Sequence, residues 1–170
     1  MYTYDASESA LERGITGITA KMLTTPDMNE FSVVNANIKN GAIDSYTVQF
    51  RSKIPHSTGD IISFKFPPEI ILQSNTGCVA LGVPSAVACT KVGSDVIQAK
   101  LTFSTTDISA STSVTFLVTN VKNPPDTRPS SSFTQIKITD STNILQLTQF
   151  TGTVAAATSE FADIVTKSLS

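Results

Sequence analysis

Alternation of apolar and polar residues is the feature that most limits how this chain can fold. It recurs from residue 31 onwards, in segments 46–50, 62–66, 97–103, 114–118 and 136–138. A period of two places successive side chains on opposite faces of a β-strand. Clusters of Gly, Pro, Asn and Asp separate the segments, as expected of turns. About seven short strands spaced in this way predict an all-β chain, an immunoglobulin-like antiparallel β-sandwich with extra terminal strand segments.

The composition argues against several classes of function. The 170 residues suit one domain, only 15% are charged, and the net charge is −2. Nucleic-acid binding needs a cationic footprint on the phosphates, which this chain lacks. No apolar run is long enough to span a bilayer. Residues 1–5 have neither the basic start nor the apolar stretch of a signal peptide, so we expect the numbering to describe a mature chain or a fragment.

Catalytic chemistry is not indicated. His56 is the only histidine, and its neighbours Pro55, Ser57 and Gly59 predict a solvent-exposed turn. No nucleophile, zinc or nucleotide motif occurs. We therefore expect no enzyme activity, no cofactor and no metal centre.

Acidic residues are scattered through predicted turns, where Asp caps its own backbone. Calcium between modules is the alternative, because loop carboxylates are ligands for hard cations. These residues are Asp27, Asp44, Asp60, Asp95, Asp107, Asp126 and Asp140.

Two cysteines, Cys78 and Cys89, bracket an apolar segment that contains turn residues. They could face each other across a hairpin and form a disulfide. Two buried free thiols in a reduced compartment are the alternative.

The two ends of the chain resemble each other. Asp5 and Asp140 each precede a Thr-Gly pair by eleven residues, so that Thr16-Gly17 matches Thr151-Gly152 at an offset of 135. Such a repeat indicates tandem modules, with chance similarity among Thr-rich strands as the alternative. We therefore divide the chain into an N-terminal extension (1–22) that resembles the last strand of a preceding module, a sandwich module (23–157), and a C-terminal segment (158–170). The last of these is either the start of another module or a short helix.

A last strand needs a sheet edge to pair with. The N-terminal extension is accordingly a candidate donor strand, either within a tandem polypeptide or added to a neighbouring copy. Its assembly residues are Ile15, Thr16, Gly17, Ile18, Thr19 and Ala20.

Residues in five places resemble the repeated extracellular β-sandwich modules of very large surface proteins in ciliates and related protists. They are Tyr46 to Phe50, Gly59 to Pro67, the cysteine pair, Asn123-Pro124 with Pro129 to Phe133, and Asp140. The resemblance implies an extracellular or surface location, a Cys78–Cys89 disulfide and a tandem context. It implies no chemistry.

The connection between residues 123 and 132 is rich in proline and hydroxyl groups, a composition that often carries O-linked sugar. A stiff crossover between two sheets is the alternative. The candidate glycosylation residues are Thr127, Ser130, Ser131 and Ser132, with modified Pro124 or Pro125.

The leading functional prediction is a structural module of an extracellular filament or surface coat, whose partners are copies of itself. The alternative is an adhesion or ligand-binding domain of a cell-surface protein. A sugar platform would need exposed aromatic rings, and the chain has no Trp and three Tyr.

If residues 15–20 are donated to a neighbouring copy, Ile15→Asp or Ile18→Asp should abolish assembly and leave the monomer folded. A charge on a donated strand would be buried against the acceptor sheet. Electron microscopy with circular dichroism of the same samples tests this, and unaltered fibres in both variants would refute strand donation.

Overall fold

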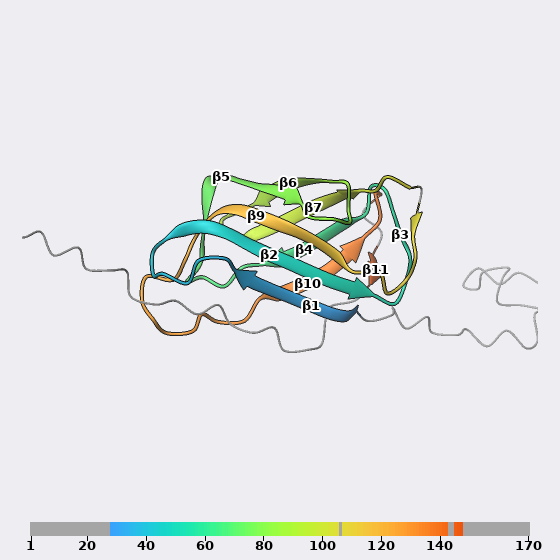
Figure 1. Cartoon of the computed structure of the whole chain (residues 1–170). Coiled ribbons are helices and arrows are strands. Elements are labelled where there is room, and N and C mark those ends of the chain that lie inside the picture. The colour runs from blue at the N-terminus through green and yellow to red at the C-terminus, as the bar shows by residue number, and fades with distance from the viewer. Residues whose placement is uncertain (1–27, 106, 143–144, 148–170) are drawn as a thin grey trace, which may run out of the picture.

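The computed structural model describes residues 28–105, 107–142 and 145–147 (Figure 1). Eleven strands and no helix occur in these ranges, so none of the described segments is a helix able to span a membrane. The strands are β1 (Met28–Asn35), β2 (Ile43–Ser52), β3 (His56–Ser57), β4 (Ile61–Lys65), β5 (Ile71–Ala80), β6 (Ala86–Val92), β7 (Val96–Thr102), β8 (Asp107–Ile108), β9 (Val114–Lys122), β10 (Thr134–Thr139) and β11 (Leu145–Leu147).

The strands form two facing antiparallel sheets. One has four strands in the order β1-β2-β9-β5, and the other has five in the order β11-β10-β4-β7-β6. A short ribbon pairs β3 with β8 at one end. The prediction of an all-β antiparallel sandwich is confirmed.

The immunoglobulin-like strand order is wrong for the described strands. An immunoglobulin sheet places its fifth strand between the second and the fourth. Here β9, late in the chain, takes that position and pairs with both β2 and β5. Strands β6 and β7, which precede it, belong to the five-stranded sheet instead.

The core lies between the sheets and is built from the alternating residues. Val48 and Phe50 of β2, Phe64 of β4, and Phe116 and Val118 of β9 are all fully buried. Aromatic rings meet edge to face or tilted, for example Tyr46 with Phe66 at 5.9 Å between centroids.

A disulfide joins Cys78 on β5 to Cys89 on β6, with 5.4 Å between the Cα atoms. The two strands belong to different sheets, so the expected hairpin geometry is wrong and the bond is a clasp between the two layers. Lys91 Nζ supports the same margin by donating to the carbonyl of Leu72 at 2.7 Å.

Several predictions fall outside the described residues. They concern the N-terminal extension 1–22 with its candidate donor strand 15–20, and the C-terminal segment 158–170.

Replacing both cysteines, in Cys78→Ala/Cys89→Ala, should lower the free energy of unfolding by about 3 kcal/mol, because the disulfide closes a short loop in the unfolded chain. Urea denaturation measures this. Reduced wild type is the control and should unfold at the same urea concentration as the variant. Equal urea midpoints for the variant and the oxidised wild type would contradict a stabilising role of the disulfide.

Candidate functional site

The outer side of the four-stranded sheet carries one row of residues that is aliphatic on three of the four strands. Register pairs Val34 with Thr47, Thr47 with Leu117, and Leu117 with Val79. Val34 is 60% exposed and Val79 is 53% exposed. We call these four residues the aliphatic face. Strand alternation produces it, because the neighbours Val33, Val48, Phe116 and Val118 point into the core.

The flanking row on this side is polar but uncharged, and it consists of Ser32, Gln49 and Thr115. Leu81, just past the end of β5, donates its N–H to the carbonyl of Thr115 at 3.1 Å and is 41% exposed. An ion pair between Arg51 and Glu30, 3.4 Å apart, marks one end of the sheet. The centre of the surface therefore carries no charge.

The outer side of the five-stranded sheet has the opposite character. Its central row pairs Lys137 with Ser63, Ser63 with Gln98, and Gln98 with Thr90. Lys100 lies on the next row and is exposed. The two outer sides therefore differ mainly in charge: lysines lie on the five-stranded sheet, which also exposes Val92, whereas the central rows of the four-stranded sheet hold no charged residue.

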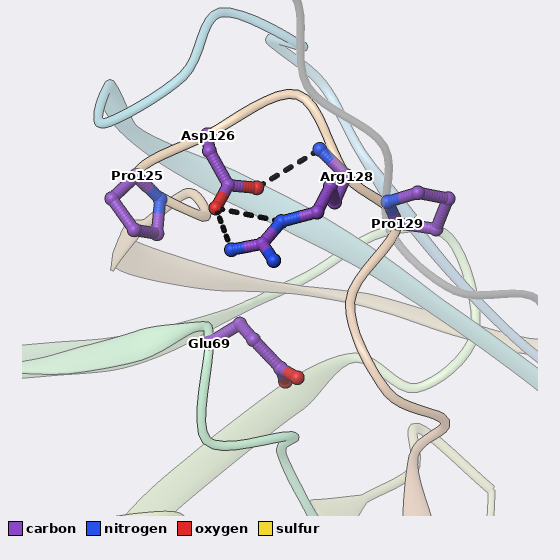
Figure 2. A pocket seen from close by; sticks show the side chains of 5 residues that line it. All are labelled: Glu69, Pro125, Asp126, Arg128 and Pro129. Atoms are coloured by element: carbon purple, nitrogen blue, oxygen red, sulfur yellow. Dashed lines mark hydrogen bonds and ion pairs between the residues drawn. The ribbon is translucent and has the colours of Figure 1, made fainter.

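The proline-rich connection forms a shallow hollow of about 210 Å³ with Glu69 (Figure 2). Inside the loop, Arg128 turns toward Asp126 and donates through its backbone N–H at 2.9 Å and through Nε at 3.0 Å. These hydrogen bonds hold the pKa of Asp126 below its usual value. The Ser131 hydroxyl donates to Glu69 at 2.8 Å and lowers the pKa of that carboxyl. Asp126 and Arg128 therefore neutralise each other within the loop, and Glu69 is hydrogen-bonded to Ser131.

The candidate glycosylation residues differ in accessibility. Thr127, Ser132 and Pro125 are exposed, whereas Ser130 and Pro124 are buried. Ser131 is also exposed, but its hydroxyl is hydrogen-bonded to Glu69. Glycosylation therefore remains a prediction, and Thr127 and Ser132 are its best-placed residues.

Buried Asn123 anchors this connection. It accepts a hydrogen bond from the Tyr46 hydroxyl at 2.7 Å, and its Nδ2 donates to the carbonyls of Asn37 and Lys39. Burial raises the pKa of the Tyr46 phenol. One asparagine thus fixes both the crossover and the β1–β2 loop, which gives the Asn-Pro motif a structural role.

A second buried polar group links three residues around the β3 corner. Ser52 Oγ lies 2.6 Å from His56 Nε2, and His56 Nδ1 lies 3.1 Å from Asp60 Oδ2. Gly59, at a φ of 105° that favours glycine, lies in the turn that brings the Asp60 carboxylate to the Nδ1 edge of the ring. With a neutral ring, Nδ1–H donates to Asp60. The Ser52 hydroxyl then donates its hydrogen bond either to Nε2 of His56 or to the carbonyl of Ile54, which lies 2.7 Å away.

Ser, His and Asp are the residue types of a hydrolase catalytic triad, but these three side chains are too buried to act as one. Ser52, His56 and Asp60 are 1%, 2% and 2% exposed. A nucleophile must reach its substrate, so this group is best explained as a structural network. The prediction that His56 is a solvent-exposed turn residue is wrong, because the ring packs edge to face on Phe50 at 5.8 Å. The partners of His56 lie four residues away on either side in the sequence.

Most of the predicted turn carboxylates have partners, two of them local in sequence and two distant. Asp44 accepts from Ser45, Asp95 pairs with Lys65 at 3.1 Å, Asp107 accepts from Ser57, and Asp140 accepts from Thr142. No group of three potential metal ligands occurs in the part of the chain that the structure describes. Asp27 lies outside that part.

Acid should destabilise the fold through His56. Burial lowers the pKa of His56, so the folded state binds a proton less readily than the unfolded state, whose pKa is about 6.5. Stability is therefore complete above that value and should fall as the pH drops below it, by at most about 1.4 kcal/mol per pH unit. Urea denaturation between pH 5 and 8 measures the effect.

The single histidine makes the control simple. A His56→Gln variant should be less stable but nearly independent of pH between about 5.5 and 7. Wild type that becomes more stable on acidification would contradict a neutral buried ring and indicate an imidazolium–Asp60 pair.

Comparisons with known proteins identify no family. No family model matches the sequence, and no curated protein matches it. Among solved structures, the chain is similar to a non-cellulosomal cohesin from the hyperthermophilic archaeon Archaeoglobus fulgidus. The identity is 13%, the match covers 76% of this chain and 90% of that chain, and the TM-score is 0.44. A likeness this weak says nothing about what the present chain binds. Of what the resemblance to protist surface modules implied, the structure contains the β-sandwich and the Cys78–Cys89 disulfide.

Proposed function

We propose that this chain is a non-catalytic protein-binding module of an extracellular or surface protein, and that its partner is a second copy of the same module. The observation that carries the proposal is the aliphatic face, where Val34 and the pair Leu117 and Val79 lie on either side of Thr47 in one row on the solvent side of a sheet. Contiguous exposed apolar side chains rimmed by polar residues mark protein-interaction sites.

The chemistry of the face favours protein over sugar. Large exposed hydrophobic residues in the described ranges are all Val, Ile or Leu, with no aromatic ring among them. Sugar-binding surfaces rely on aromatic stacking. An uncharged row of aliphatic residues and threonine suits a similar uncharged row, and two copies related by a twofold axis bring the same rows together.

The expected contact is weak. Four strands and about seven residues of each give a surface of roughly 20 Å by 25 Å, below the size of most stable interfaces. Modules linked in one array would strengthen it, because linkage makes each further contact intramolecular.

The internal repeat favours a second candidate, the structural module of a filament or coat. Modules would then be joined in tandem, or head to tail through donation of residues 15–20. The disulfide agrees with an oxidising, extracellular location.

A lysine at the centre of the aliphatic face should abolish self-association. We expect Leu117→Lys to weaken the dimer at least about tenfold, because the charge must be desolvated on contact. Sedimentation equilibrium over micromolar to millimolar concentrations measures this.

Gln98→Lys is the matched control, since Gln98 is also half-buried and lies on the outer side of a central strand of the other sheet. It should associate like wild type, and both variants should keep the wild-type melting temperature. The proposal would be refuted if both lysine variants weakened self-association equally, or if the wild type stayed monomeric over the whole concentration range.

A further inference from the structure

The two margins of the sandwich are built differently. At the margin of β5 and β6, the disulfide and the bond from Lys91 to Leu72 close the layers on each other. The opposite margin is formed by β1 and β11, and in Figure 1 β1 runs along the lower border of the molecule while β5 and β6 lie along the upper one.

Ring contacts show how the layers overlie. Phe31 of β1 meets Phe64 of β4 at 5.5 Å, and Phe64 also meets Phe116 of β9 at 6.5 Å. With β5 over β6 at one margin, β1 lies over the region of β4 and β10. Strand β11 therefore extends one position beyond β1, and a fifth strand next to β1 would make the layers equally wide.

The backbone of β1 is oriented to accept such a strand. Ala36 donates to the carbonyl of Ser45 at 3.0 Å, which marks this position as a hydrogen-bonded pair with β2. Bonded and non-bonded pairs alternate in an antiparallel ladder. The N–H and C=O of Val33 consequently point to the side of β1 that faces away from β2. The register is regular over this stretch, since its only irregularity lies between Met28 and Glu30.

The sequence supplies a suitable segment three residues after β11. Residues 150–155 share three of six residues with 15–20 at the constant offset of 135, namely the pairs Thr16/Thr151, Gly17/Gly152 and Ala20/Ala155. Facing sheets are about 10 Å apart and an extended residue covers about 3.3 Å, so about three residues are enough to cross from one sheet to the other.

We propose that residues 150–155 pair with β1 of the same chain as the fifth strand of the four-stranded sheet. By the repeat, residues 15–20 are the matching strand of a preceding module. Residues 21–27 are then the link between two modules. This inference develops the tandem hypothesis and does not depend on the aliphatic face, so the two can fail separately.

Proline scanning with hydrogen exchange tests the pairing in the full chain. Proline removes a backbone donor, and N–H groups of adjacent residues point to opposite sides of a strand. One of the two variants Thr151→Pro and Gly152→Pro should therefore accelerate exchange of residues 28–36 on the order of tenfold. Exchange of β7 should not change and reports that the module remains folded.

Thr16→Pro and Gly17→Pro are the matched controls at the offset of 135, and both should leave β1 as protected as in wild type. Unchanged protection of β1 in both variants of residues 151 and 152 would overturn the proposal. Loss of protection in the 16 or 17 variants instead would also overturn it, because the occupant would then be the N-terminal strand of another copy.

Discussion

Contact between aromatic rings across the two sheets is the interaction on which the structure depends. Phe64, on a central strand of the five-stranded sheet, meets Phe31 and Phe116 of the facing sheet and Phe66 of its own region. Each ring is buried because its strand alternates, so a register slip by one residue would expose all of them together. This couples the pairing of β1, β2, β4 and β9 in one packing unit.

Buried polar groups secure the regions that the aromatic core does not reach. Asn123 binds Tyr46 and two carbonyls of the β1–β2 loop, and His56 joins Ser52 to Asp60 at the β3 corner. A buried polar atom without a partner costs free energy, so each group favours one loop conformation over others. The shape of both ends of the sandwich follows from these two networks.

The surface that remains has two unlike sides. One sheet presents aliphatic residues and threonine without central charge, and the other presents Lys100 and Lys137 among polar and aliphatic neighbours. The uncharged row on the four-stranded sheet is the surface on which the proposed self-association rests. Weak contacts of this kind gain strength from repetition, which agrees with the similarity between the two ends of the chain.

The sequence by itself determined the fold class, because a period of two fixes which side chains are buried once strands pair. Tyr46, Phe64 and Phe116 could be assigned to the core from that period alone. It did not reveal β5, where the register shifts between Leu72 and Gly77 and interrupts the alternation. The strand order could not be predicted either, because no local feature of the β9 sequence indicates that β2 and β5 flank it.

Only the tertiary structure decided the site. The aliphatic face joins β1, β2, β9 and β5 across more than eighty residues of sequence, and pairing register alone aligns its side chains. His56 reads as an exposed turn residue because its sequence neighbours are turn formers. Its burial depends on Phe50 and on a Gly59 turn that brings Asp60 within hydrogen-bond distance of Nδ1. Cys78 and Cys89 are close in sequence, yet they bridge two layers, because whether strands share a sheet is decided by long-range packing.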